Sequence, residues 1–268
     1  MKSKVMSLTD AVQLVKDGQL LAIGGNSLHR NPAAFCNELA KLKRKGLKAC
    51  GAAHGYATDV LCAVESIDEV YFGFFGFENE FGLAAGFRKK AQEGKIKAME
   101  GSCTAQIAAL RGGAYGVPFM PVGGMWGSDL LQLRPEFYRV MKSPFSDEEV
   151  VCVRSLRPDW AIIHVQEADE FGNARIIGPE YQDVLMSRAA KKTIITTEKI
   201  VPTETFKENP KLTSIPYFLV EAVVEVPGGA KPGICYSLYE QVDAEVMNAY
   251  LKAVKDDTLD EYLAKVTA

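Results

Sequence analysis

The sequence predicts an α/β fold, with a mostly parallel sheet that carries helices on both faces. Short apolar segments alternate with helical segments of about 10 to 15 residues, and this order is typical of βαβ units. One segment, Trp160–Val165, is almost continuously apolar, as expected for a strand that is covered on both faces. Glycine-rich turns follow several of the predicted strands. These observations indicate an open sheet whose binding crevice lies beyond the carboxyl ends of its strands.

The size and charge of the chain limit the classes of protein to which it can belong. The 268 residues, of which 47% are hydrophobic, can bury a large core, and we expect residues 1–268 to form a single domain. The formal net charge of −3 argues against nucleic acid or an anionic membrane surface as the main partner. The N-terminus does not resemble a signal peptide, and no apolar stretch approaches the roughly 18 to 20 residues that span a membrane. We therefore expect a cytoplasmic protein.

The cysteines and histidines give little support for a metal site. The six cysteines show no CxxC or other ligand spacing and lie in apolar or small-residue segments, so we expect reduced thiols in the core. His54 and His164 have no aspartate or cysteine at ligand spacing, and we expect no bound metal. His164 lies inside the apolar strand and is interpreted as a hydrogen-bonded core residue. The sequence contains no GxSxG motif, so it gives no support for a Ser-His-Asp triad.

Capping residues define the first helices. Ser7–Asp10 has the spacing of a capping box, and the helix that it opens is expected to reach Asp17. A second helix is predicted with Asn31 as N-cap and Pro32 at the first helical position, and it should end before Gly46. A short apolar strand connects the two helices, and it runs directly into a glycine-rich turn.

The same alternation continues along the chain. Strands are predicted over 19–23, 47–53, 70–75, 95–100, 119–122, 150–153, 160–165, 175–177, 193–197 and 218–226. Helices are predicted over 57–65, 81–92, 103–115, 181–190, 238–254 and 259–266. Residues 130–147 are expected to form a connecting excursion near the surface. In the segment 157–179, Asp169 and Asn173 are interpreted as turn-forming residues rather than as part of a site.

The first candidate site is the turn that follows strand 19–23. Its residues are Gly24, Gly25, Asn26, Ser27, Leu28, His29 and Arg30. The paired glycines allow backbone N–H groups to approach a ligand, and the helix that follows favours negative charge at its N-terminus. The turn matches neither GxGxxG nor a Walker motif, so nucleotide binding has weak support. His29 and Arg30 could bind a carboxylate or a CoA-linked acyl chain, or they could equally cap or salt-bridge the loop.

Further loops carry glycines next to polar side chains. Candidate binding residues in them are Phe77 and Glu78, with Glu80 close by, and Gly127 and Ser128. Glu80 is explained more simply as a helix-capping residue, because acidic side chains are common in the first turn. We expect these loops and the Gly24–Arg30 turn to converge at one edge of the sheet.

Glu100 is the candidate catalytic residue. It is expected to leave a buried strand and to head the small-residue sequence Glu-Gly-Ser-Cys-Thr. Such a carboxylate can serve as a base or a nucleophile, and it can also accept backbone N–H groups that order its turn.

Several ordered motifs resemble the α (A) subunit of class I CoA-transferases, especially the glutaconate CoA-transferase type. They are GQLLAIGG followed by Arg30 and Pro32, VYFGFFGFENEFGLAAGFRKKAQEGKIKAME, ALRGGAYGVPFMPV, GSDL and RPDWAIIHVQEADEFGNARIIG. The resemblance covers essentially the whole chain. It implies an open α/β fold of the CoA-transferase type and an active site between an α and a β subunit, commonly in an α2β2 assembly.

The resemblance also implies a mechanism and its partners. A glutamate of the β subunit would attack an acyl-CoA and pass CoA through glutamyl-CoA to a second carboxylic acid. His29 and Arg30 suggest a dicarboxylic acid for this acceptor. The CoA thioester is then a substrate, and no permanently bound cofactor is implied. The loop Gly24–Arg30, Glu78 and Glu100 would line the acyl pocket.

Relatives on the same scaffold imply other functions. Some are ring-opening hydrolases or decarboxylases of CoA thioesters, and in the hydrolase type an α-subunit glutamate does the chemistry. Glu100 stands in a suitable place for that role. A noncatalytic subunit that binds the CoA thioester or only completes its partner's site is a third interpretation.

Overall fold

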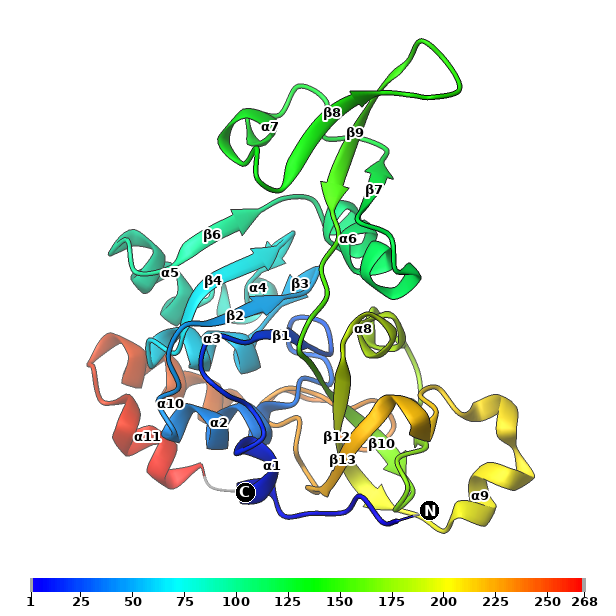
Figure 1. Cartoon of the computed structure of the whole chain (residues 1–268). Coiled ribbons are helices and arrows are strands. Elements are labelled where there is room, and N and C mark those ends of the chain that lie inside the picture. Colours follow the sequence, from blue (N-terminus) through cyan, green and yellow to red (C-terminus); the bar gives the residue numbers. More distant parts are fainter. Residues whose placement is uncertain (1, 267–268) are drawn as a thin grey trace.

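The computed structural model describes residues 2–266 and is built on a parallel sheet, which confirms the predicted fold class (Figure 1). Seven parallel strands follow one another in the order β13-β12-β10-β1-β2-β4-β6, and β11 (Ala174–Arg175) pairs antiparallel with β10. The parallel strands are β1 (Leu20–Ile23), β2 (Leu47–Cys50), β4 (Ile67–Phe72), β6 (Lys97–Glu100), β10 (Trp160–Ala168), β12 (Lys192–Ile200) and β13 (Val220–Glu225).

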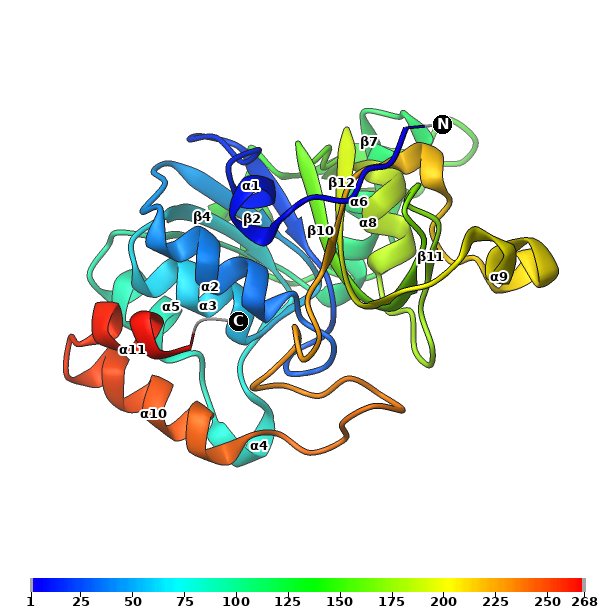
Figure 2. The same ribbon diagram turned by 90° about the horizontal axis from the view of Figure 1, so that it is seen from below.

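Helices cover both faces of this sheet (Figures 1 and 2). One face carries α1 (Leu8–Val12), α2 (Ala33–Lys41), α3 (Tyr56–Ala63), α5 (Ala85–Gln92), α10 (Ala244–Lys255) and α11 (Leu259–Lys265), and the other carries α6 (Cys103–Tyr115) and α8 (Asp183–Ala189). Each face of the sheet has its own hydrophobic core; the core on the face with α2 and α3 is called the first, and the core on the face with α6 and α8 the second. Successive residues of a strand point to opposite faces, so Ile162 lies in the first core and Ile163 in the second.

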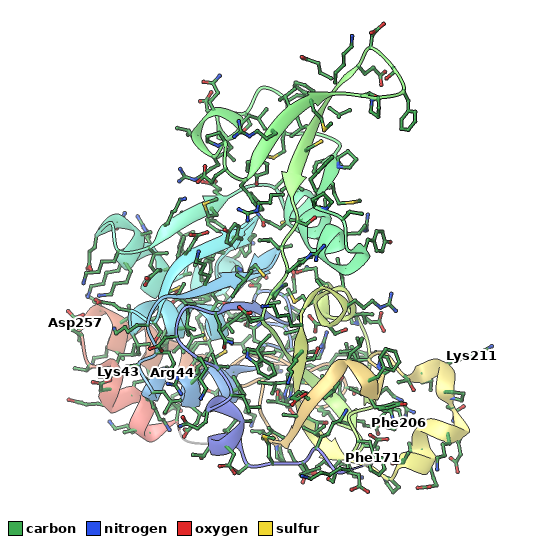
Figure 3. All side chains as sticks on the ribbon, viewed as in Figure 1. Lys43, Arg44, Phe171, Phe206, Lys211 and Asp257 are labelled. Carbon is green, nitrogen blue, oxygen red and sulfur yellow. The ribbon has the colours of Figure 1, made fainter. Side chains whose placement is uncertain are left out.

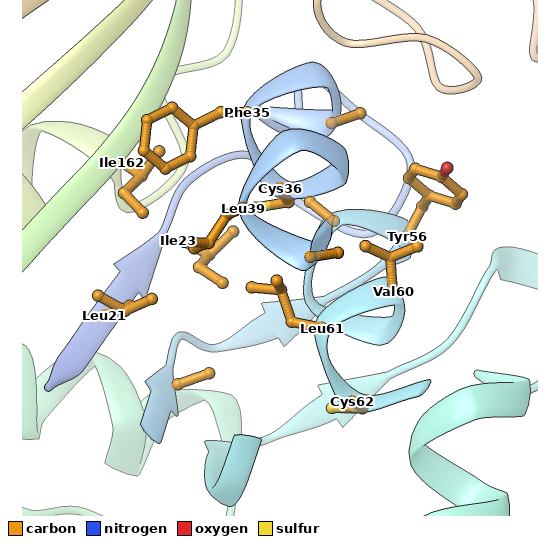
Figure 4. Packing of buried hydrophobic residues seen from close by; sticks show 14 of the residues in the cluster. Leu21, Ile23, Phe35, Cys36, Leu39, Tyr56, Val60, Leu61, Cys62 and Ile162 are labelled. Carbon is orange, nitrogen blue, oxygen red and sulfur yellow. The ribbon is translucent and has the colours of Figure 1, made fainter. Parts of the chain in front are cut away.

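The first core is densely packed around β1 and α2. Leu21 and Ile23 contact the same cluster as Phe35, Leu39 and Leu61, and all five side chains are buried (Figure 4). Truncating one such leucine to alanine typically costs about 2–5 kcal/mol, because it removes apolar burial and leaves a cavity. This packing fixes the position at which β1 ends and the glycine turn begins.

The strand order reverses between β1 and β10. From β1 the chain adds β2, β4 and β6 in one direction, whereas β10, β12 and β13 extend in the other. In open parallel sheets, ligands bind outside the carboxyl ends of the strands at such a reversal. The turn after β1 therefore lies at the expected binding position of this fold.

A smaller antiparallel sheet projects from the molecule (Figure 1). It consists of β7 (Phe119–Val122), β9 (Glu149–Arg154) and β8 (Tyr138–Lys142), with α7 (Leu130–Leu133) in the connection. The residues 130–147, expected to form a connecting excursion near the surface, are mostly exposed, but they contain α7 and the paired strand β8, which the sequence did not predict. The apolar residues of 119–122 predict a strand but do not specify its partner, and the pairing with β9 is decided by long-range contacts.

The remaining elements are short. They are β3 (Ala53–His54), β5 (Phe74–Phe75), α4 (Glu78–Phe81), α9 (Thr203–Glu208) and the 3-10 turns Pro210–Leu212 and Tyr217–Leu219. The helix predicted over 81–92 begins only at Ala85 and forms α5, whereas Phe81 ends the separate short helix α4, because Gly82 takes a positive φ of 73°. The helix predicted over 238–254 begins only at Ala244, where Asp243 caps it.

Two predicted helix boundaries near the N-terminus need correction. Ser7 does cap α1, since its hydroxyl accepts the Asp10 N–H at 3.1 Å, but the helix ends at Val12 rather than Asp17. The residue at the cap of α2 is Pro32 and not Asn31. Asn31 instead donates its side-chain amide to the Gly24 carbonyl at 3.1 Å, which stabilises the turn after β1.

The turn in the segment 157–179 has the predicted structure. One carboxylate oxygen of Asp169 accepts the backbone N–H groups of Phe171 and Asn173 at 3.0 and 2.9 Å. The other oxygen accepts the side-chain amide of Asn173 at 2.7 Å. These contacts satisfy the carboxylate within the turn, so Asp169 is a turn-forming residue, as expected.

The cysteines are all unpaired, and five of the six are buried, as expected for core thiols. The exception is Cys103, which is exposed at the start of α6. Among the described residues, the helices are too short or too polar to cross a bilayer.

Candidate functional site

The turn after β1 is held in a conformation that needs glycine. The Gly24 N–H still follows the sheet and donates to Ile162 O at 2.9 Å, whereas Gly25 has a left-handed φ of 81°. A Cβ on Gly25 would collide with the His29 carbonyl, so the second glycine is required by space as well as by φ. The Gly25 N–H donates to Asp183 at 2.9 Å and is therefore already bound within the protein.

Arg30 and Asp183 form a buried ion pair beneath this turn. Nη1 of Arg30 lies 2.6 Å from Asp183 Oδ2 and 2.8 Å from the His164 carbonyl, and Nη2 lies 3.0 Å from the Pro179 carbonyl. The side chains of the pair are only 4% and 0% exposed. Both terminal nitrogens of Arg30 are thus occupied, and the contacts match the salt-bridge alternative for this residue. Asp183 had no recognisable signal in the sequence, since it lies 153 residues away.

His164 and Glu198 continue the polar network below the turn. His164 Nε2 lies 2.8 Å from Glu198 Oε1, and Nδ1 lies 2.9 Å from the Thr196 hydroxyl. Burial lowers the pKa of His164, so the neutral ring donates from Nε2 to the carboxylate and accepts the threonine hydroxyl at Nδ1. The prediction of a hydrogen-bonded core histidine is confirmed.

The same network brings together possible metal ligands that the sequence spacing does not reveal. Ligand atoms of His164, Glu198 and Cys235 lie within 4.8 Å of one another. However, Glu198 already accepts the Tyr239 hydroxyl and, at 2.7 Å, the Gly228 N–H. The protein's own donors therefore satisfy this carboxylate, and the arrangement ties the loop 227–241 to β10 and β12.

A cleft of about 420 Å³ opens beside the turn. Its lining residues are Leu28, His29, Phe77, Glu78, Glu80, Ile234, Glu240, Gln241 and Val242. They come from the turn after β1, from α4 and from the segment before α10, and Figure 2 shows α4 next to the start of α10. The structure thus brings the predicted residues His29, Phe77 and Glu78 together at one place.

Unusual backbone conformations occur in the loops that form this cleft. Left-handed φ angles are found there at Ser27, Arg30 and Glu78, and other non-glycine residues far from the cleft, such as Lys43 and Asp257, have them too. Such conformations cost of order 1–3 kcal/mol each and are retained where surrounding contacts impose them, often at functional sites. The buried Ser27 shows one such contact, because its hydroxyl donates to the Gly76 carbonyl at 2.9 Å and joins the two loops.

Glu100 lies at the same edge of the sheet but outside the cleft. It ends β6, which is three strands from β1 in the sheet order and hence roughly 14 Å away at the usual strand spacing. Its side chain is exposed, so the expectation that it leaves a buried strand is wrong. The reason is that β6 is the edge strand of the sheet.

Gly127 and Ser128 do not join the other candidate residues at the edge of the parallel sheet. Their loop follows β7, which belongs to the projecting antiparallel sheet, and Ser128 Oγ accepts the Leu130 N–H at 3.3 Å. The expected convergence of the loops therefore holds for the turn after β1 and the Phe77–Glu80 loop but not for this one.

A second cleft of about 400 Å³ lies on the helical surface, and its residues Lys45 and Glu65 precede β2 and β4, so it lies toward the amino ends of the strands. Its lining contains lysines and acidic residues that pair with each other, such as Lys43 with Asp260 at 2.8 Å and Lys89 with Asp257 at 2.6 Å. Figure 3 shows Lys43 and Asp257 on the side of the molecule that carries α10 and α11. Because these lysines and carboxylates offset each other, the second cleft has no excess positive charge with which to attract an anion.

Comparison with known proteins gives a consistent family assignment. The family model of coenzyme A transferases matches residues 5–226. The A subunit of glutaconate CoA-transferase from Acidaminococcus fermentans is 33% identical over 272 residues, covering 94% of this chain and 84% of the relative. The cholesterol ring-cleaving hydrolase IpdA subunit of Rhodococcus jostii is 28% identical, covering 85% of this chain and 80% of the relative.

An uncharacterized protein of Archaeoglobus fulgidus is 36% identical over 269 residues. The match covers 99% of this chain but only 59% of the relative, so the present chain spans a little over half of that longer protein.

Solved structures agree with these sequence matches. Glutaconate coenzyme A-transferase from Acidaminococcus fermentans superimposes with a TM-score of 0.91 and 31% identity, covering 98% of this chain and 88% of that chain. The decarboxylase AibA/AibB superimposes with a TM-score of 0.88 and 26% identity, covering 99% of both chains. From the matched family model and this agreement in sequence and structure, we conclude that the chain belongs to the coenzyme A transferase family.

Proposed function

We propose that this chain is the α (A) subunit of a heteromeric CoA-transferase that moves CoA between an acyl-CoA and a carboxylic acid. The observation that carries the proposal is the similarity to the A subunit of glutaconate CoA-transferase along nearly the whole chain. The cleft at the reversal of the strand order supports it, because apolar side chains and ordered loops there can hold an acyl group.

The nucleophile of the reaction is a glutamate of the partner subunit. Its carboxylate attacks the thioester carbon, the C–S bond breaks, and CoA leaves as a thiolate with the bonding electron pair. The thiolate then attacks the glutamyl carbonyl and releases the first acid as a carboxylate, which leaves glutamyl-CoA. The second carboxylate attacks glutamyl-CoA, and the same two steps in reverse form the new acyl-CoA and restore the glutamate. No oxidant or net proton is needed.

This chain supplies the wall that holds the acyl group. The turn Gly24–Arg30, fixed by Asp183, and the buried Phe77 shape a surface that excludes water from the acyl chain. Large exposed apolar side chains lie in the segments that flank the cleft, namely Phe74, Leu83, Tyr236 and Leu238. Their exposure supports a partner subunit that covers this edge, since monomeric proteins seldom expose such groups together.

The proposal is tested by separating the subunits. The chain purified alone should show no CoA transfer, because the nucleophile is on the partner, and transfer should appear when the β-type partner is added. Transfer of radiolabelled CoA between two acids, measured with the mixture and with each subunit alone, provides the readout. Robust transfer by the isolated chain would contradict the proposal.

A ring-opening hydrolase or decarboxylase is the second candidate function. The superposition with AibA/AibB and the 28% identity to the IpdA subunit favour it, together with the exposed carboxylate of Glu100 at the edge that a partner would cover. A noncatalytic, CoA-thioester-binding subunit is the third.

Glu100→Ala distinguishes these functions. A transferase with its nucleophile on the partner should keep forming glutamyl-CoA, with turnover within about 3-fold of wild type. In a hydrolase that uses Glu100, turnover should fall by about 100-fold or more, as expected when a general acid or base is removed. Glu208→Gln, an exposed glutamate on α9, is the matched control. Trapping the covalent adduct by mass spectrometry separates the outcomes, and a noncatalytic subunit is indicated if the adduct and turnover are absent from the assembled complex.

A further inference from the structure

We propose that the cleft of this chain selects acyl groups whose far end is uncharged and disfavours those that end in a second carboxylate. The inference rests on the proposed function, because it concerns the acyl group that a CoA-transferase subunit would hold. It specifies the substrate class of the same site.

The charges that line the cleft support this selectivity. Three carboxylates, those of Glu78, Glu80 and Glu240, surround a floor whose accessible apolar side chains are Ile234 and Val242, with the buried Leu28 and Phe77 beneath them. Among the described residues lining the cleft, the one basic side chain is the imidazole of His29. An aliphatic acyl chain can contact the floor, whereas a terminal carboxylate would lie close to groups of its own sign.

Arg30 lies near the cleft and could in principle bind the second carboxylate of a substrate, but it already forms an ion pair with Asp183. Its guanidinium contacts Asp183 and two backbone carbonyls, and its side chain is 4% exposed. Binding a substrate carboxylate would require breaking this buried pair and leaving Asp183 charged and unpaired, which is strongly unfavourable. A terminal carboxylate would therefore lose its hydration without gaining a cationic partner from this chain.

The magnitude follows from screened Coulomb repulsion. Like charges at about 6–10 Å, in an effective dielectric of about 20 or more and with a screening length of about 8 Å, change affinity by about 3- to 10-fold. The effect should weaken at high salt, because the carboxylates of the cleft are on exposed residues.

The test compares two acyl groups of equal chain length in the assembled complex with its β-type partner. Valeryl-CoA and glutaryl-CoA differ only in the terminal carboxylate, and acetate serves as acceptor for both. We expect kcat/KM to be higher for valeryl-CoA by about 10-fold, and this ratio to shrink as salt is raised. The double variant Glu78→Gln, Glu240→Gln should lower the ratio by about 3- to 10-fold, while Glu208→Gln should leave it unchanged.

The outcomes separate this inference from the proposed function. A preference for glutaryl-CoA, or a ratio that neither salt nor the double variant changes, would overturn the selectivity while leaving CoA transfer in place. Absence of transfer from both thioesters in the assembled complex would instead overturn the proposed function on which the inference rests.

Discussion

At the scale of single residues, the buried pair of Arg30 and Asp183 is the feature that organises the site. The two charges pair with each other, and two further N–H groups of the arginine donate to the carbonyls of His164 and Pro179. The same aspartate accepts the Gly25 N–H, so one carboxylate holds both ends of the turn after β1. Arg30 is therefore expected to act by positioning the turn rather than by binding a substrate.

This role predicts strong coupling between the two residues. Arg30→Ala and Asp183→Ala should each lower the free energy of unfolding by about 3–5 kcal/mol, because each leaves a buried charge unpaired. The double variant should cost clearly less than the sum, since no lone charge remains. Urea unfolding of the four proteins measures the coupling, with the exposed Lys207→Ala as a control that should cost about 0.5 kcal/mol or less.

A kinetic comparison of the same variants tests the positioning role. If Arg30 acts through the turn, Arg30→Ala and Asp183→Ala should change kcat and KM in the same way for charged and uncharged acyl groups. An increase in KM confined to Arg30→Ala and to substrates with a second carboxylate would show that the guanidinium contacts substrate instead.

His54 predicts a pH dependence of stability. Its Nε2–H donates to the Tyr71 carbonyl at 3.0 Å and its Nδ1 accepts the Thr58 hydroxyl at 2.9 Å, and burial lowers its pKa from 6.5 to about 4. Between pH 6.5 and about 4, the imidazole of His54 is protonated in the unfolded chain but stays neutral in the folded chain. The stability present above pH 6.5 is therefore lost as pH falls toward 4, by about 3 kcal/mol in all.

The variant His54→Gln cannot bind this proton, so its free energy of unfolding should fall less than that of wild type between about pH 7 and about pH 5. Urea unfolding at both pH values gives the two differences, and their comparison removes the contribution of other titrating groups. Equal pH dependence in the two proteins would show that His54 does not carry the effect.

At the scale of elements, one carboxylate joins three helices. Asp59 of α3 accepts the N–H groups of Gly86 and Phe87 in the first turn of α5, at 2.9 and 2.6 Å, and the Tyr250 hydroxyl of α10 at 2.7 Å. Helix α5 has no side-chain cap of its own, so Asp59 supplies it from a neighbouring helix. Burial nevertheless raises the pKa of Asp59 to about 6, so its ionisation costs stability as pH rises from 3.8 to about 6.

Removing the tyrosine donor should therefore have a pH-dependent cost. Tyr250→Phe should lower the free energy of unfolding by about 1.5–3 kcal/mol above pH 6, where the hydrogen bond is to a charged group, and by less at about pH 5. Urea unfolding at both pH values checks this, and Tyr115→Phe, on an exposed side chain, should change stability by about 0.5 kcal/mol or less. A cost independent of pH would indicate a packing effect only.

At the scale of the whole molecule, both cores share one sheet, because neighbouring residues of each central strand enter opposite cores. We therefore expect the chain to unfold as one cooperative unit. In Trp126→Phe, the remaining tryptophan is Trp160, which is 7% exposed in β10 and reports on the sheet. Its fluorescence and the far-ultraviolet circular dichroism should give coincident urea transitions. Separate transitions would show that the projecting sheet or one helical layer unfolds independently.

The sequence alone determined the features that depend on neighbouring residues. Apolar runs and glycine turns located most strands and helices of the parallel sheet, Ser7 and Asp169 were recognised from local capping and turn chemistry, and the turn after β1 was identified as the first candidate site. These succeed because backbone preferences and short-range hydrogen bonds are set within a few residues.

The tertiary structure decided how distant segments meet. Only the folded chain shows that Arg30 forms an ion pair with Asp183. It also shows that β7 and the Gly127–Ser128 loop that follows it belong to the antiparallel sheet, and that Glu100 is exposed on an edge strand. The physical reason is that strand pairing and the partner of a buried charge depend on contacts between segments far apart in the chain. A local pattern specifies that a strand or a charge is present, but it does not specify which partner satisfies it.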